Sequence, residues 1–342
     1  MERRKFLKTL AAATPAMMAA CSSGEVPEVI EEQAQLAAQL GTTLPLRPLG
    51  ATGEQVTMLG VGGYHVGWTE EKDAQAVIET ALEGGVRFFD NAESYNNGVA
   101  ETRYGKWLTP KYRDQVFIMT KTTGRDAATA EKHLEESLQR MNTDYLDLWQ
   151  VHSLQDPEDV DQRIENGVLD VFVKAKESGK VRFIGFTGHT NPEAHLRMLE
   201  HTKDSNIFDA AQMPINVMDS NYHSFIKKVV PELQARNIAL LAMKTLADGR
   251  FFPKKETLDG VIWETEDPVV PNRLSIAEAL NFVWSLPVSV LITGAENANL
   301  MKEKIEMAKS FTEISEADRN ALIEKVADLA DGKVEYFKNP VA

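Results

Sequence analysis

The chain of 342 residues contains a single cysteine, Cys21, so it can form no disulfide within itself and no metal cluster held by several cysteines. Basic residues are also scarce, since 37 lysines and arginines stand against 51 aspartates and glutamates, a formal net charge of −14. Nucleic acids and acidic lipids are bound by clustered basic side chains. The composition therefore argues against nucleic acid as a partner and against polybasic membrane docking. No metal site is expected either.

A second absence concerns the turn Gly-x-Gly-x-x-Gly, which opens the first helix of a doubly wound dinucleotide-binding sheet. The nearest stretch, Gly60-Val61-Gly62-Gly63, lacks the third glycine at the required spacing. This counts against an open doubly wound sheet, which remains the alternative architecture.

Long apolar runs are missing too, and the longest candidate lies in the first residues of the chain. Arg3 and Arg4 precede an apolar run over 9–20 that is too short for a membrane-spanning helix. The paired arginines resemble a twin-arginine export signal, and Met18-Ala19-Ala20-Cys21 resembles a lipoprotein cleavage box. We expect a signal over 1–21, lipidation of Cys21, a tether over 22–45 and a catalytic domain over 46–342. The expected location is the periplasmic side of the membrane, contacted only through the lipid; a leader without function would leave the protein cytoplasmic.

From residue 46 onward, short apolar runs alternate with segments of helical periodicity. Turn residues Thr52-Gly53 predict a hairpin at the start of this region. Eight strands are predicted, at 59–63, 86–89, 115–120, 145–151, 181–186, 208–213, 238–243 and 288–293. Eight helices are predicted between and after them, at 73–83, 100–108, 128–141, 164–178, 192–201, 224–236, 275–285 and 299–310. An irregular segment at 244–273 and a last helix at 316–330 complete the pattern. Eight such units predict a (β/α)8 TIM barrel with an N-terminal β-hairpin and an extra C-terminal helix.

Polar residues of complementary chemistry stand at the ends of three consecutive predicted strands. Asp90 and Tyr95 follow the second strand, Lys121 follows the third, and His152 follows the fourth. Taken singly, each has an ordinary explanation, such as a helix-capping Asp, a half-buried Tyr, an exposed Lys or a His bonded to backbone. A parallel barrel gathers its strand ends around one cavity. Together they therefore predict a site containing a carboxylate, a phenol, an ammonium and an imidazole.

With these motifs the sequence resembles the aldo-keto reductase family. The resemblance rests on the segment Phe89 to Tyr95, on Thr120-Lys121, on the segment Gln150 to Ser153, and on the segment Val181 to Phe186. It implies that Tyr95 is the general acid, that Lys121 lowers the pKa of Tyr95, that Asp90 holds Lys121, and that His152 orients the carbonyl. It also implies an NAD(P)(H)-dependent oxidoreductase that interconverts a small carbonyl compound and its alcohol.

The resemblance further implies a nicotinamide dinucleotide across the barrel mouth, NADP(H) by family habit and NAD(H) as the alternative. The residues that correspond to its contacts are Gly63, Tyr64, Asp90, Thr187, Gly188, Gln212, Met243, Lys244, Thr245, Leu246, Gly294 and Ala295. Several depart from the usual pattern. Gly188 lacks the usual amide side chain, Met243 replaces an aromatic, and Gly294 and Leu300 stand where many NADPH-dependent relatives carry Lys and Arg. Glu296 would repel a 2′-phosphate if it pointed inward.

The substrate is less constrained. His65, Trp68 and His189 are expected to reach the mouth, and they suit a sugar, a ketone or an aldehyde equally well. A second functional hypothesis is a redox-sensing or regulatory module that binds the dinucleotide and turns over little. The complete set of four polar residues favours catalysis, because a pure binder does not need all four.

Overall fold

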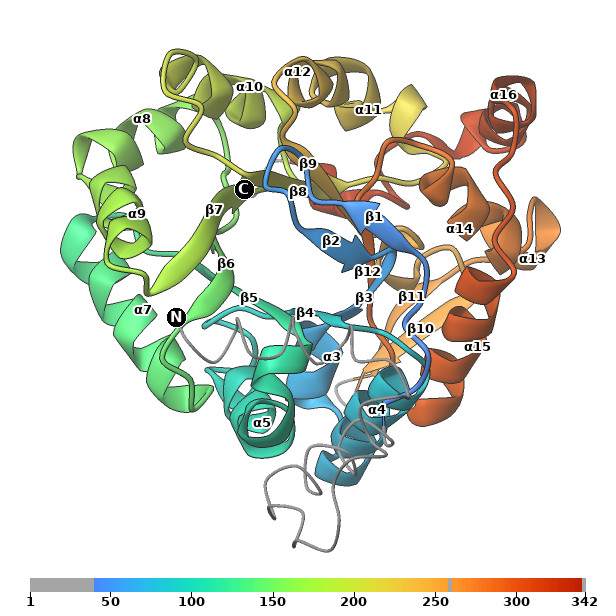
Figure 1. The fold of residues 1–342 in the computed structure, drawn as a ribbon. Helices are drawn as coiled ribbons and strands as arrows, with labels where there is room; N and C mark the ends of the chain where they lie inside the picture. The colour runs from blue at the N-terminus through green and yellow to red at the C-terminus, as the bar shows by residue number, and fades with distance from the viewer. Residues whose placement is uncertain (1–39, 258–259, 340–342) are drawn as a thin grey trace, which may run out of the picture. The chain divides into compact units, whose positions relative to one another are not determined.

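The computed structural model describes residues 40–257 and 260–339. Their central feature is a closed barrel of parallel strands in the order β12-β3-β4-β5-β6-β7-β8-β9 (Figure 1). The strands are β3 (Leu59–Gly62), β4 (Phe88–Asp90), β5 (Phe117–Thr122), β6 (Leu146–Val151), β7 (Val181–Thr187), β8 (Ala210–Pro214), β9 (Ala239–Met243) and β12 (Val290–Thr293). Closure confirms the predicted (β/α)8 barrel and rules out the open sheet.

Helices surround the barrel, as Figure 1 shows. They are α3 (Gly63–Trp68), α4 (Glu71–Glu83), α5 (Val99–Trp107), α6 (Thr109–Tyr112), α7 (Ala127–Arg140), α8 (Pro157–Glu165), α9 (Val168–Glu177), α10 (Pro192–His201), α11 (Phe225–Lys228), α12 (Val230–Ala235), α13 (Val269–Asn272), α14 (Ile276–Trp284), α15 (Ala298–Lys309) and α16 (Glu316–Glu324). A capping box is present at the start of α14, with Ser275 and Glu278 each bonding the other's backbone N–H. None of the helices within 40–257 and 260–339 combines the length and apolar character needed to span a bilayer.

The structure differs from the prediction in several elements. Helices α3 and α8 are additional, and the predicted helix at 224–236 is broken at Val229 because Pro231 lies in the first turn of α12 and has no N–H to continue α11. The segment 244–273 is not irregular throughout, since β10 (Lys254–Thr257) and β11 (Gly260–Glu264) form an antiparallel hairpin. The last helix ends at Glu324 rather than at 330.

The predicted N-terminal hairpin is present, formed by β1 (Leu46–Pro48) and β2 (Gln55–Thr57), and it closes one end of the barrel. Leu49 and Val56 are buried in one cluster with residues at the starts of strands, among them Phe117 and Ala239. Arg47 fixes the hairpin by donating hydrogen bonds to the carbonyl oxygens of Trp284 and Val288. The functional site is therefore restricted to the opposite end, where the strands finish.

The register of the strands determines which side chains line the open end of the barrel. Met119 on β5 and Leu148 on β6 lie in the apolar core of the barrel and pair with each other. Two residues further along each strand, on the same face, stand Lys121 and Gln150, which also pair. Asp90 likewise follows core residue Phe88, and Gln212 follows core residue Ala210. A polar layer thus lies directly above the apolar core of the barrel.

Candidate functional site

The site is built around the ammonium group of Lys121, which is 1 % exposed. Its Nζ lies 2.5 Å from Asp90 Oδ1, donates to the backbone carbonyl of Asn91 at 2.6 Å and lies 3.1 Å from the hydroxyl of Tyr95. Strand β5 continues two residues beyond the predicted end, so Lys121 points into the barrel from within the strand. The predicted grouping of Asp90, Tyr95 and Lys121 is therefore present.

Tyr95 is held by the turn that follows β4. The turn is tied to β5 by hydrogen bonds from Glu93 N to the carbonyl of Lys121 and from Thr123 N to Glu93 Oε1. The Tyr95 ring meets Tyr64 edge to face, with 5.5 Å between ring centroids. These contacts fix the phenol above the polar layer while Tyr95 stays partly exposed at the mouth.

His152 joins the group from the end of β6. The backbone N–H of His152 donates to the backbone carbonyl of Thr122 at 2.8 Å. This hydrogen bond continues the sheet by one residue. The centroids of the His152 ring and the Tyr95 ring lie 5.7 Å apart. Burial, together with the Lys121 charge, lowers the pKa of His152 well below its usual value, so the imidazole is neutral at pH 7.

Burial and the neighbouring charges act in opposite directions on the pKa values of Lys121 and Tyr95. Burial disfavours the charged form of Lys121, but Asp90 and Tyr95 outweigh it and raise the pKa of Lys121. Burial also raises the pKa of Tyr95 to about 12, although Lys121 acts to lower it. Lys121 thus acts on the pKa of Tyr95 in the direction that the resemblance implies, but desolvation of the phenol is the larger effect and the net pKa is raised.

At the end of β8, Gln212 offers a contact for an amide. Its Nε2 donates to Asp90 Oδ1 at 3.5 Å, while its Oε1 is buried without a hydrogen-bond partner among the described residues. An acceptor in that state suits an external N–H donor, as a carboxamide provides. Thr187 pairs with Gln212 across the sheet.

Gly188 shows why the usual amide side chain is missing after β7. A Cβ at this position would lie 2.6 Å from the carbonyl oxygen of Leu154 and 3.0 Å from the His195 ring. Any side chain would therefore displace the neighbouring loop backbone. Gly63, the first residue of α3, is restricted in the same way, because its Cβ would lie 2.5 Å from the carbonyl oxygen of Asp90.

The loop after β9 carries several of the predicted dinucleotide contacts. Met243 is partly exposed at the strand end, Thr245 is buried and Leu246 is partly buried. The ammonium of Lys244, another of these residues, is paired with Asp248 at 3.0 Å.

The loop after β12 is covered by His65 from α3. A Cβ on Gly294 would lie 2.0 Å from His65 Nδ1, so a glycine is required for this packing, and neighbouring Ala295 is buried. Lys304 of α15 reaches back and donates to the carbonyl of Gly294, a contact that the sequence pattern did not indicate. Glu296 is exposed. His65, predicted to contact substrate, therefore lies against the predicted cofactor loop.

The remaining predicted substrate residues lie around the same opening. Tyr64 is 54 % exposed, and Trp68 packs on His65 with 5.8 Å between ring centroids. His189, after β7, faces Phe337 with 6.4 Å between ring centroids. The C-terminal segment that carries Phe337 was not predicted to approach the site.

That segment, here called the C-terminal strap (Glu335–Asn339), is fixed by a buried ion cluster. The ammonium of Lys338 is fully buried, lies 2.7 Å from Asp219 and 3.0 Å from Glu335, and donates to the carbonyl of Tyr222 at 2.8 Å. Burial raises the pKa of Glu335 to about 6. The strap thereby joins the loop after β8 to the mouth.

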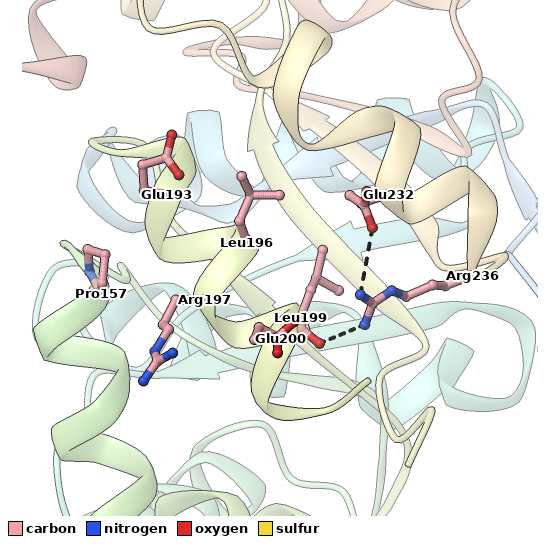
Figure 2. A pocket seen from close by; sticks show the side chains of 8 residues that line it. All are labelled: Pro157, Glu193, Leu196, Arg197, Leu199, Glu200, Glu232 and Arg236. Carbon is pink, nitrogen blue, oxygen red and sulfur yellow. Dashed lines mark hydrogen bonds and ion pairs between the residues drawn. The ribbon is translucent and has the colours of Figure 1, made fainter. Parts of the chain in front are cut away.

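A cavity of about 410 Å³ lies elsewhere, on the outer side among α8, α10 and α12 (Figure 2). Its lining includes Arg236, which contacts the carbonyl of Leu199 and the carboxylate of Glu232. The cavity draws on none of the residues at the strand ends, so it is not part of the candidate site.

Comparisons with known proteins agree with this geometry. Residues 58–326 match the family model described as the aldo/keto reductase family. An aldo-keto reductase from Bacillus halodurans superimposes with a TM-score of 0.67, covering 82 % of this chain and 96 % of its own at 22 % identity. A Klebsiella pneumoniae aldo-keto reductase, described as in complex with NADPH, superimposes with a TM-score of 0.63, covering 89 % of this chain and 97 % of its own at 19 % identity.

Two relatives show the range of sequence similarity. An uncharacterized oxidoreductase of Bacillus subtilis is 24 % identical over 295 residues, which cover 77 % of this chain and 91 % of that protein. The L-galactose dehydrogenase of Arabidopsis thaliana is 34 % identical over 160 residues, which cover 43 % of this chain and 49 % of that enzyme. Since the family model spans most of the barrel, the chain belongs to the aldo/keto reductase family of oxidoreductases.

Proposed function

We propose that the protein catalyses the NAD(P)(H)-dependent interconversion of a small carbonyl compound and its alcohol. The observation that carries the proposal is the position of the Lys121 ammonium, 2.5 Å from Asp90 and 3.1 Å from the Tyr95 hydroxyl. A buried cation that contacts a phenol oxygen stabilises the phenolate left when the phenol gives up its proton. Tyr95 is therefore suited to donate a proton to a carbonyl oxygen as carbon receives a hydride.

The other side chains have supporting roles in this proposal. Asp90 keeps Lys121 charged and in place, and neutral His152 can donate a hydrogen bond that orients the carbonyl oxygen. In the reverse direction the Tyr95 phenolate would accept the alcohol proton.

The residues present fit a nicotinamide dinucleotide. The unpartnered Oε1 of Gln212 suits a carboxamide donor, and Thr187 lies beside it. Lys244 and Lys304 bring positive charge to the loops after β9 and β12, where phosphates would be held. When bound, the nicotinamide would supply or accept the hydride. The NADPH named for the Klebsiella pneumoniae relative supports NADP(H) as the cofactor. NAD(H) is the alternative, because the exposed carboxylate of Glu296 would repel a 2′-phosphate if it turned toward the cofactor. A comparison of kcat/KM for NADPH and NADH decides between the two.

The test is turnover of aldehydes, ketones and sugars by the wild type and by Tyr95→Phe. Sugars belong in the panel because one relative is named an L-galactose dehydrogenase. Loss of a positioned proton donor should lower kcat about 10²–10⁴-fold. Tyr145→Phe, just before β6, is the matched control and should retain wild-type turnover. A Tyr95→Phe variant that keeps wild-type kcat would refute the proposed role.

The second hypothesis, a redox-sensing module, makes a different prediction for the same assay. It requires dinucleotide binding by the wild type with no measurable turnover across the whole panel. The Lys121 contact with Tyr95 favours the enzyme, because binding alone gives no reason to bury a cation against a phenol.

A further inference from the structure

A second imidazole, that of His189, lies beside His152 at the open end of the barrel. The strands that carry the two residues, β6 and β7, are neighbours and pair in parallel. Beyond them the backbone N–H of Leu154 donates to the carbonyl of Thr187 at 2.8 Å, which keeps the two following loops together. His189 is also among the groups whose charge acts on the pKa of His152. Two imidazoles from adjacent strand ends therefore share one opening.

One nitrogen of the His189 ring is left for a ligand. Its Nδ1 is buried and has no hydrogen-bond partner among the described residues. The ring meets that of Phe337 edge to face, with 6.4 Å between ring centroids, and Phe337 is buried in the C-terminal strap. The side chain as a whole is partly exposed. Nε2 is therefore the atom that a molecule in the mouth can reach, and the strap holds the ring in place.

The charge state of His189 limits the kind of group that it can bind. Burial first, and the charge of Lys244 with it, lower the pKa of His189 to about 4, so the ring is neutral near pH 7. Lys244 is paired with Asp248 at 3.0 Å, so its charge is already compensated. A neutral imidazole has one donor and one acceptor nitrogen, and a hydroxyl group can both accept and donate. A hydroxyl group thus suits Nε2 in either tautomer, whereas an anion gains no charged partner here.

The neighbouring groups determine where this hydroxyl would lie in a substrate. In the proposed function, His152 orients the carbonyl oxygen that Tyr95 protonates. Neighbouring strands lie about 4.8 Å apart, so groups at the ends of β6 and β7 are close enough to bond two oxygen atoms on adjacent carbons. The ring of Tyr64, which is 54 % exposed and meets Tyr95 edge to face, offers an apolar surface to the C–H groups of such a molecule.

We propose that His189 binds a hydroxyl group on the carbon next to the reacting carbonyl, and that the preferred substrates are small α-hydroxy aldehydes or ketones. The proposal rests on the proposed function for the position of the carbonyl, at Tyr95 and His152. A substrate without the hydroxyl leaves the hydrogen bond of Nε2 unmade when it covers the ring. A site that binds a hydroxyl in this way discriminates against the analogue that lacks it by about tenfold or more.

The experiment compares kcat/KM for propanal, 2-hydroxypropanal and 3-hydroxypropanal, three aldehydes with the same carbon chain. The wild type should prefer 2-hydroxypropanal to propanal by about tenfold or more. It should prefer 3-hydroxypropanal much less, because that hydroxyl lies one carbon too far from the carbonyl.

Two variants of His189 and one control connect this preference to the ring. His189→Phe keeps a ring against Phe337 but has no hydrogen-bonding nitrogen, so it should abolish the preference for 2-hydroxypropanal over propanal. His189→Asn, whose amide can donate and accept, should retain part of it. His201→Phe is the matched control, since His201 pairs with Asp161 on the outer helices, and it should keep the wild-type preference.

Equal kcat/KM for propanal and 2-hydroxypropanal in the wild type would overturn the inference and leave the proposed function intact. That comparison needs no variant, so it does not depend on the folding of His189→Phe. A His189→Phe variant that keeps the wild-type preference would also overturn the inference.

An NMR titration in the presence of NADPH tests the same contact without turnover. Propane-1,2-diol should bind to the wild type about tenfold more tightly than propan-1-ol, and the two alcohols should bind alike to His189→Phe. Equal affinities in the wild type would overturn the inference. A protein that reduces none of the aldehydes would refute the proposed function, and this titration would then decide on the hydroxyl contact by itself.

Discussion

At the scale of single residues, the site depends on the balance between burial and partners. Lys121 and Asp90 are almost completely buried and pair with each other, so neither charge is left alone in the barrel. Their grouping with Tyr95 and His152 could be predicted, because each follows an apolar strand and strand ends converge. The net pKa of Tyr95 could not be predicted, because its desolvation depends on loops that come from distant parts of the chain.

The neutral state of His152 gives a prediction for the pH profile. Burial holds the pKa of His152 well below its usual value of 6.5, so the ring does not titrate in the range around pH 6.5. We expect kcat for carbonyl reduction to show no ionisation near pH 6.5. His152→Gln should lower kcat and leave the shape of the profile unchanged in that range. An inflection near pH 6.5 in the wild type that is absent from the variant would contradict this assignment.

The packing of His65 on Gly294 predicts a coupled pair. Gly294→Ala should destabilise the protein by about 1–3 kcal/mol, because its methyl group would overlap the imidazole ring. In a His65→Ala background the same change should cost much less, because the ring is gone. Urea denaturation of the two single variants and the double variant measures the coupling. Additive effects would show that the ring does not determine the need for glycine.

At the scale of elements, the strands and most helices could be predicted from the sequence. The elements that could not be predicted are those whose formation depends on tertiary contacts. In the hairpin of β10 and β11, β10 is short and polar and β11 has its apolar residues in one run, so neither strand shows the alternating pattern that predicts a hairpin. The C-terminal strap has no periodicity at all. It is ordered by the buried contacts of Lys338 with Glu335, three residues before it, and with Asp219, which is 119 residues away and could not be paired with Lys338 from the sequence.

The ion cluster of the strap predicts a large effect from a single change. Lys338→Met leaves two buried carboxylates without their cation, which should cost about 3–5 kcal/mol, either globally or as local release of the strap. Lys333→Met, whose side chain is largely exposed, is the control and should change stability by less than about 0.5 kcal/mol. Thermal unfolding and hydrogen exchange of residues 335–339 measure the two forms of the effect. Wild-type values for both in Lys338→Met would contradict the assigned role of the cluster.

At the scale of the whole molecule, the alternation of strand and helix was enough to predict the barrel, because eight parallel units of this length have few other ways to bury their strands. The leader and Cys21 lie outside the described residues, as does most of the tether. We propose that Arg3 and Arg4 direct export and that Cys21 is lipidated.

This proposal is tested by fractionating cells that express the full chain. The wild type should be found in the membrane fraction on the periplasmic side, and Cys21→Ser should be released to the soluble periplasmic fraction. Arg3→Lys together with Arg4→Lys should leave the protein in the cytoplasm. A wild-type protein that stays in the cytoplasm, with Cys21 unmodified by mass spectrometry, would refute the proposal.

The end of the barrel that the hairpin closes is also the end at which the described chain begins. The described chain enters along the closed end, where Gly41 and Leu44 bond to the backbone of Leu82 and Gly85 just before β4 begins. This entry point therefore lies on the face opposite Tyr95. The entry of the chain and the open end of the barrel do not share a face, so groups bound at the entry point would leave the approach of reactants to Tyr95 uncovered.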